Sequence, residues 1–272
     1  MADVSSHAAG IVREADPDRY LSVLYAPTAH REALWALYAF DAETARIRDL
    51  IHEPMPGEIR LQWWRDAIAA GQATGHPVAD ALITAVAEYR LPVAAFDNML
   101  EARIFDLYDD PMPDRTTLEG YCGETGSALI QLAAMVLDAD AARSTADLAG
   151  HAGCAQVIAH LLRLLPLHAS RGQCYVPADI LAAVGSDREQ LLAGGEGRRR
   201  AVSAMVSLAR EHLTAFESGA KSLPPPLRPA FLPMALVPAL IEGIEEAPEA
   251  GGRTVSTLRR HWLLLRGALR GW

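Results

Sequence analysis

The stretch ALYAFDAETARIRDLIHEP, residues 36–54, belongs to a long predicted helix with two different faces. At about 100° per residue, the helix over residues 31–51 has an apolar face suited to a protein core. The residues of this face are Ala33, Leu37, Phe40, Thr44, Ile47 and Ile51. A second, mixed face carries Leu34, Tyr38, Asp41, Ala45, Arg48 and Asp49. Two interpretations fit this pattern: a helix that lines a polar cavity, or a surface helix with solvated Asp/Arg pairs.

The composition predicts helix almost everywhere else in the chain. Half of the 272 residues are hydrophobic, alanine and leucine dominate, and no segment alternates apolar and polar residues for long. Prolines and glycines divide the chain into about ten predicted helices. One of these is capped by Thr28 and ends near His52. No break resembles a domain linker, so we expect an all-α protein with a single domain over residues 1–272.

Charge and cysteine usage exclude several classes of protein. The formal net charge of −9 argues against nucleic-acid binding, which needs a broad positive surface. The three cysteines are odd in number and form no CxxC pair, which disfavours a zinc site or a disulfide framework. The first residues lack the apolar core of a secretory signal, and no uncharged run of about 20 apolar residues predicts a spanning helix. These features are typical of a cytoplasmic protein.

Five short segments occur in the order in which a known family carries them. They are APTAHREALWALYAF (26–40), LQWWRDAI (61–68), EARIFDL (101–107), LEGYCGETGSAL (118–129) and HLLRLLPLHASRGQCYVPADIL (160–181). Together they resemble the squalene/phytoene synthase family, the head-to-head trans-isoprenyl diphosphate synthases. This resemblance covers nearly the whole chain and implies the isoprenoid synthase fold, a shell of helices around a central cavity. It places Asp106 at the position of a family aspartate.

Enzymes of that family hold Mg²⁺ with two DxxxD motifs on facing helices, and the metal helps a diphosphate group to leave. By the resemblance, the first motif falls on Ala45 and Asp49, and the second on Leu164 and His168. Three of the four carboxylates are thus replaced, and leucine and neutral histidine are poor ligands for Mg²⁺. If a metal binds, Asp41 and Asp49 are its candidate ligands. We expect no catalytic residue and no ordinary Mg²⁺-dependent prenyl coupling.

A more specific resemblance is to the non-catalytic branch related to the mitochondrial assembly factor of respiratory complex I. The residues that match its first pattern are Phe40, Glu43, Ala45, Arg48, Asp49, Glu53, Gly57, Arg60, Gln62 and Trp64. Those that match its second pattern are Arg163, Pro166, His168, Ser170, Arg171, Pro177, Asp179 and Ile180. The resemblance implies a non-enzymatic protein that binds a complex I subunit, an assembly partner or a lipid-like ligand, in the cytoplasm or peripheral to the inner membrane.

Two other functions remain open at this point. One is an active transferase that joins two prenyl diphosphates, with Mg²⁺ held by Asp41, Asp49 and Asp106. The other is a carrier of isoprenoids or other lipids, without chemistry of its own.

The candidate ligand site combines residues from both motif regions: Tyr38, Asp41, Arg48, Asp49, His160, Arg163, His168, Arg171 and Tyr175. His160 and His168 are predicted on one face of a single helix, either as metal ligands or as packed side chains. Pro166 is expected to kink that helix between them. The arginines form either a basic pocket for a diphosphate or anionic headgroup, or ion pairs with Glu43, Asp49 and Asp106.

The C-terminal segment RRHWLLLRGALRGW, residues 259–272, is basic and rich in leucine and tryptophan. This composition suits a membrane surface or an acidic partner helix. A last helix that docks on its own domain has the same pattern.

Overall fold

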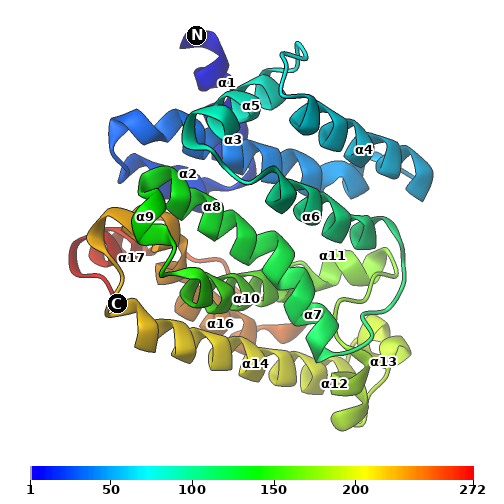
Figure 1. Ribbon diagram of the computed structural model, residues 1–272. Coiled ribbons are helices and arrows are strands. Elements are labelled where there is room, and N and C mark those ends of the chain that lie inside the picture. Colours follow the sequence, from blue (N-terminus) through cyan, green and yellow to red (C-terminus); the bar gives the residue numbers. More distant parts are fainter. Residues whose placement is uncertain (1) are drawn as a thin grey trace. The chain divides into compact units, whose positions relative to one another are not determined.

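The computed structural model describes residues 2–272, with side chains described from His7 onward, and every regular element among them is helical (Figure 1). The α-helices are α1 (Ala2–Ala15), α2 (Pro17–Leu24), α3 (Thr28–Ala45), α4 (Pro54–Ala70), α5 (Pro77–Tyr89), α6 (Val93–Ile104), α7 (Arg115–Cys122), α8 (Ala128–Leu137), α9 (Ala139–Ala142), α10 (Ala146–Arg163), α11 (Leu165–Ser170), α12 (Ala178–Ala183), α13 (Arg188–Ala193), α14 (Glu196–Ala220), α15 (Arg228–Phe231), α16 (Val237–Glu246) and α17 (Thr257–Arg270). Short helical turns join them: η1 (Arg46–Leu50), η2 (Phe105–Leu107), η3 (Gly123–Ser127), η4 (Pro225–Leu227), η5 (Leu232–Leu236) and η6 (Pro248–Ala250). The predicted all-α class is confirmed.

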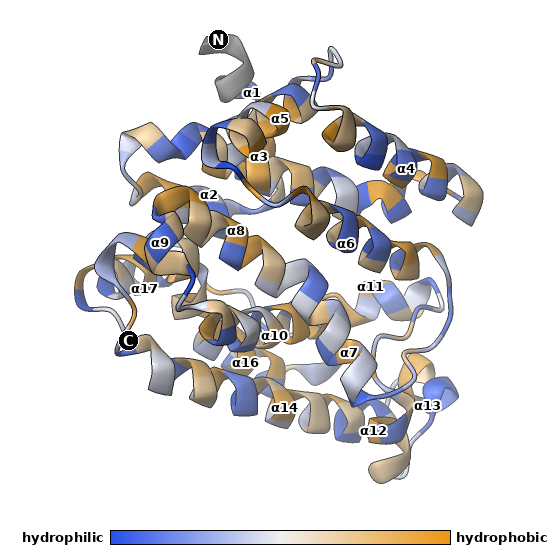
Figure 2. Ribbon diagram, viewed as in Figure 1, coloured by the Kyte–Doolittle hydropathy of each residue, from blue (hydrophilic) through white to orange (hydrophobic). Residues whose placement is uncertain are grey.

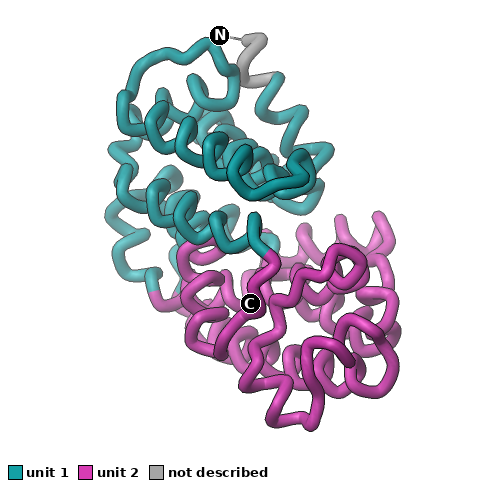
Figure 3. The backbone as a smooth tube through the Cα atoms, turned by 90° about the vertical axis from the view of Figure 1, so that its right-hand side faces the viewer, with its two compact units in different colours: residues 1–108, 128–146, 223–233 teal, residues 109–127, 147–222, 234–272 magenta. Residues whose placement is uncertain are grey.

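The helices divide into two compact units, each built from three separate stretches of chain (Figure 3). Unit 1 contains Met1–Tyr108, Ala128–Ala146 and Leu223–Pro233. Unit 2 contains Asp109–Ser127, Asp147–Ser222 and Met234–Trp272. The chain passes between the units within helical segments after Ser127, Ala146 and Pro233, and in non-helical segments after Tyr108 and Ser222.

Helix α3 is the core element of unit 1 and packs against α1, α5 and α8. All six residues of the predicted apolar face are buried, including Ile47 and Ile51, which lie beyond the end of α3. Phe40 meets the rings of Trp64 and Phe96 edge-on, with centroids 5.2 and 5.6 Å apart. Leu34, Tyr38 and Asp41 of the mixed face are buried as well, whereas Ala45 and Asp49 are exposed.

The ends of α3 differ from the sequence prediction. Pro27 occupies the N-cap position, without a side-chain hydrogen bond, and Thr28 is the first helical residue rather than the cap. At the other end the α-helix stops at Ala45 and continues as the tighter turn η1. Because the pitch changes there, the α-helical spacing that placed Arg48 and Asp49 on the stripe of Asp41 does not hold beyond Ala45.

Helix α7 begins at Arg115, capped by Asp114, and the π-helical turn η3 joins it to α8. This turn places Ser127 directly against Gly153 of α10, so a Cβ atom at Gly153 would overlap the backbone of Ser127. A Cβ atom at Gly126 would likewise overlap the side chain of Val157. Small residues thus permit the close approach of helical segments in this region.

Helix α14 organises unit 2 and packs against α12, α13 and α16. In Figure 2, blue and orange segments follow one another along α4 and α14, as in amphipathic helices. The segment Pro225–Glu246 is long and apolar enough to cross a membrane by length and composition, although the sequence analysis predicted no such segment. Within the protein 72% of its apolar window is buried, as is usual for a core segment.

Candidate functional site

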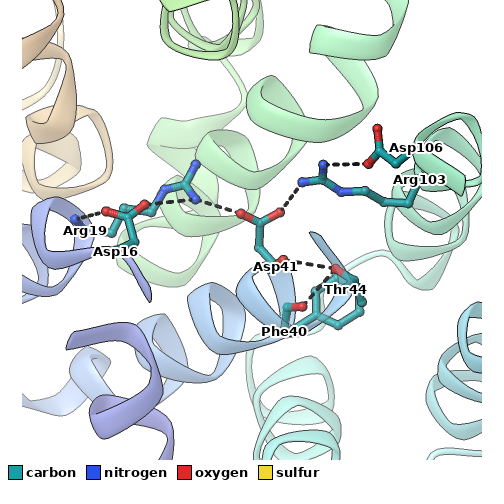
Figure 4. A network of polar contacts seen from close by, with 7 residues as sticks. All are labelled: Asp16, Arg19, Phe40, Asp41, Thr44, Arg103 and Asp106. Carbon is teal, nitrogen blue, oxygen red and sulfur yellow. Dashed lines mark hydrogen bonds and ion pairs between the residues drawn. The ribbon is translucent and has the colours of Figure 1, made fainter. Parts of the chain in front are cut away.

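Asp41 is the centre of a buried ionic cluster in unit 1 (Figure 4). Helix α3 carries Asp41, α2 carries Arg19 and α6 carries Arg103. Arg19 donates from Nη1 to Oδ2 of Asp41 at 2.7 Å, and Arg103 donates from Nη2 to Oδ1 at 2.9 Å. Only 8% of the surface of Asp41 is exposed. Both oxygens of the one buried acid on this helix face are thus engaged by guanidinium groups.

Two further carboxylates extend the cluster at its ends. Arg103 also donates from Nη1 to Oδ2 of Asp106 at 3.2 Å, and Nη1 of Arg19 lies 3.4 Å from Oδ2 of Asp16. Asp16 in addition accepts the backbone N–H of Arg19 at 2.9 Å and so caps α2. The result is an alternating row of charges, Asp16, Arg19, Asp41, Arg103 and Asp106. Alternation offsets the cost of removing each charge from water.

The cluster shifts the titration of its members. Burial by itself raises the pKa of Asp41, but the charges and hydrogen bonds of Arg103 and Arg19 outweigh it and the pKa is lowered. Burial would lower the pKa of Arg19, yet Asp16 and Asp41 reverse the effect and the pKa is raised. Burial raises the pKa of Tyr38 to about 12, although the Arg19 guanidinium, 5.4 Å from the ring centroid, acts in the opposite direction. Asp41 and Arg19 are therefore charged, and Tyr38 is neutral, at physiological pH.

The residues present do not fit a magnesium clamp. Mg²⁺ needs carboxylate oxygens free to face the metal, and those of Asp41 each accept a hydrogen bond from an arginine. A cation at Asp41 would also lie beside two positive guanidinium groups. Across the side chains described, residues 7–272, no group of three His, Cys, Asp or Glu residues is placed to hold a metal ion. The sequence hypothesis that Asp41 is a metal ligand therefore conflicts with its geometry.

The second motif region, in unit 2, contains a helix break and a pair of rings. Helix α10 ends at Arg163 and α11 begins at Leu165, so the kink expected from Pro166 is present. His160 and His168 consequently lie on two helices rather than on one, and His160 is exposed whereas His168 is buried. The ring of His168 lies 4.7 Å from that of Tyr175, which lies 6.0 Å from Tyr121.

The break is stabilised by backbone contacts on both sides. The N–H of His168 donates to the carbonyl of Leu164 at 2.9 Å, and the N–H of Gln173 donates to the carbonyl of His168 at 2.9 Å. Gly251, with φ of 72°, approaches so closely that a Cβ atom there would overlap the carbonyl oxygen of Arg163. Aromatic packing and backbone turns thus occupy the region where the family resemblance placed metal-binding aspartates.

The remaining predicted site residues are distributed over both units. Arg48 and Asp49 lie on η1 of unit 1; Arg163 is exposed at the end of α10, and Arg171 is half-buried in unit 2. Two of the acids proposed as partners for these arginines have other partners. Asp106 pairs with Arg103, and Oε2 of Glu43 lies 3.6 Å from Nε2 of His76.

Arg19 and Arg103 are the functional-site residues that sequence reasoning missed. Each carried a local signal, because Arg19 follows Asp16 by three residues and Arg103 precedes Asp106 by three. Those spacings predict only local surface pairs. The convergence on Asp41 depends on how α2, α3 and α6 pack, which no spacing within one helix reveals.

Comparisons with known proteins agree with this architecture. The family model described as squalene/phytoene synthase matches residues 12–265. A relative from Bos taurus, described as NADH dehydrogenase (ubiquinone) complex I, assembly factor 6, is 30% identical over 87% of this chain and 72% of its own. The Homo sapiens protein of that description is 30% identical over 82% of this chain and 68% of its own. A presqualene diphosphate synthase from Zymomonas mobilis is 30% identical over 64% of this chain and 61% of its own.

Two solved structures share the fold. A dehydrosqualene synthase in complex with a ligand superposes with a TM-score of 0.83, covers 97% of this chain and 95% of its own, and is 17% identical. Squalene synthase HpnC from Alicyclobacillus acidocaldarius gives a TM-score of 0.75 over 90% of this chain and 94% of its own, at 20% identity. The chain therefore belongs to the squalene/phytoene synthase family.

Proposed function

We propose that this protein is a non-catalytic member of its family that assists the assembly of respiratory complex I. The observation that carries the proposal is the 30% identity to proteins named complex I assembly factor 6, over 82–87% of this chain.

The ionic cluster supports the same proposal. Departure of a diphosphate group from a prenyl chain needs cations that stabilise the developing negative charge. Asp41 holds two arginines in this protein instead of facing a metal ion. A buried, mutually satisfied row of charges serves to hold α2, α3 and α6 in one arrangement, which is a structural task.

In this role the protein presents a stable helical fold to a partner or to a lipid-like ligand. An assembly partner belonging to complex I is the binding partner that the relatives' names suggest. A prenyl diphosphate or related lipid is the ligand that the fold suggests. Peripheral attachment to a membrane suits either, since the chain would work beside a membrane enzyme.

The experiment is gene deletion in the host with complementation. We expect deletion to lower NADH:quinone oxidoreductase activity and the amount of assembled complex, and the wild-type gene to restore both. Asp49→Ala should restore them equally well, because no metal chemistry is required of it. Asp41→Asn should complement poorly, in proportion to its lower protein level. Unchanged NADH:quinone activity in the deletion strain would overturn the proposal.

One observation favours a transferase as the second candidate function. The chain is 30% identical over 181 residues to a presqualene diphosphate synthase and 25% identical over 244 residues to a 15-cis-phytoene synthase of Synechococcus elongatus. This candidate requires metal ligands that Asp41 does not offer in the arrangement described above. A product assay with prenyl diphosphates distinguishes the two functions directly.

A further inference from the structure

Helix α17 of unit 2 has an apolar stripe that the protein does not cover. Its buried side is formed by Leu264 and Gly267. The opposite side exposes four large apolar residues at helical spacing: Leu258, Trp262, Leu265 and Leu269. Leu258 is 86% exposed and Leu269 is 72% exposed, so most of each side chain is in contact with solvent. The stripe runs the length of the helix, so it forms a continuous surface rather than scattered side chains.

A row of arginines lies along one edge of this stripe. On a helical projection Arg259, Arg266 and Arg270 fall together, next to the apolar residues. With Arg260, the helix carries four arginines and no acidic residue, in a chain whose net charge is −9. The guanidinium of Arg266 lies over the ring of Trp262, 5.6 Å from its centroid. Positive charge is thus concentrated beside the apolar stripe.

Contacts with the rest of unit 2 fix helix α17 in place, so its apolar stripe stays exposed on the surface. Ser256 accepts the backbone N–H of Arg259 at 3.4 Å and caps the helix. The side chain of Arg259 donates to Glu242 of α16 at 2.7 Å. Beyond the helix, the ring of Trp272 meets that of Phe216 edge-on at 5.2 Å.

A cavity of about 770 Å³ lies beside the stripe, between α14, α16 and α17. Its apolar lining includes Met234, Pro238 and Leu263, and Trp262 borders both the cavity and the stripe. The apolar surface is therefore irregular, because the cavity lies next to the protruding apolar stripe. Fluid acyl chains adapt to such a shape, whereas a rigid partner helix would need a matching ridge of its own.

We propose that α17 docks the protein on an anionic lipid surface. The four apolar residues enter the boundary between headgroups and acyl chains, and Arg266 and Arg270 beside them bind lipid phosphates. Trp262, an amphipathic ring at the edge of the stripe, lies at headgroup depth. This inference concerns a surface distinct from the Asp41 cluster and does not depend on the function proposed above.

Vesicle flotation tests the proposal with the full-length protein. We expect binding to vesicles of phosphatidylcholine with 30% phosphatidylglycerol, weak binding to phosphatidylcholine alone, and release by about 0.5 M NaCl as charges are screened. Binding should shift Trp fluorescence to shorter wavelength in the wild type and much less in Trp262→Phe. Leu258→Glu/Leu269→Glu should weaken binding at least tenfold, since two leucines no longer enter the apolar layer.

Matched variants separate this helix from general surface effects. Ile59→Glu changes a comparably exposed apolar residue on α4, and we expect it to leave vesicle binding unchanged. Arg270→Gln should weaken binding about fivefold, and Arg143→Gln, the same change at an exposed arginine that directly follows α9, should not. Equal losses in these controls, or equal binding to both lipid compositions, would overturn the proposal. Absence of wild-type flotation would also overturn it and would make α17 a protein-docking helix instead.

Discussion

The two motif regions of this protein differ in what fills them. In unit 1, Asp41 is a buried acid one helical turn before the motif position Ala45, and its charge is balanced by Arg19 and Arg103. In unit 2, the region of Leu164 and His168 contains a helix break and the tilted rings of His168 and Tyr175. One region thus depends on charge and the other on shape. Stabilisation by charge and stabilisation by packing should respond differently to mutation.

The largest expected effect comes from removing the central charge of unit 1. Asp41→Asn keeps the size of the side chain but leaves two arginines without their shared carboxylate in a buried place. We expect a loss of about 3–5 kcal/mol in the free energy of unfolding, measured by urea titration. Asp140→Asn is the control, because Asp140 forms only an exposed pair with Arg143. If Asp41→Asn lowers the free energy of unfolding no more than the control does, the ionic cluster is not what stabilises unit 1.

The next effect tests the packing account of unit 2. Gly153→Ala places a Cβ atom against the backbone of Ser127, which cannot move away as a flexible side chain could. We expect destabilisation of about 1–3 kcal/mol. Gly150→Ala, on the same helix, meets nothing within 4 Å and should stabilise by up to about 1 kcal/mol through helix propensity. If both variants changed the free energy of unfolding in the same direction and by the same amount, close helix packing would not be what determines stability here.

The pH dependence of stability should separate the two regions again. Because the pKa of Asp41 is lower in the folded protein, its contribution is complete above the ordinary carboxyl pKa and is lost as the pH falls through the lowered value. One such group changes stability by at most about 1.4 kcal/mol per pH unit. Urea midpoints from pH 7 to pH 2 should therefore fall less steeply in Asp41→Asn than in the wild type. The urea midpoint of Gly153→Ala should vary with pH in the same way as that of the wild type. A different pH dependence in this variant would contradict the assignment of charge to unit 1 and packing to unit 2.

The smallest effect concerns an ionic network that lies at the surface of unit 2. Arg115 donates to Glu119 and to Glu211, each at 2.7 Å, but all three side chains are partly or largely exposed. We expect Arg115→Gln to lower the free energy of unfolding by less than about 1 kcal/mol, and less still in 0.5 M NaCl. A salt-independent loss as large as that of Asp41→Asn would mean that unit 2 depends on charge as well.

Much of the fold could be predicted from the sequence, because helix periodicity and breaks are local. The apolar face of α3 and the kink at Pro166 both follow from residues within a few positions of each other. The candidate site could be predicted less well. Asp41 was singled out, but its partners come from helices 22 and 62 residues away in sequence. The change to η1 after Ala45 also altered the helical phase on which Asp49 had been placed.

The most direct test of the central claim is a product assay on the purified protein. Farnesyl or geranylgeranyl diphosphate, Mg²⁺ and NADPH are incubated with it, and the extract is analysed for head-to-head coupled hydrocarbons and their diphosphate intermediates. A protein that keeps the family fold without the metal clamp should give no coupled product above a heat-treated sample. A coupled product that disappears in Asp49→Ala would contradict the account.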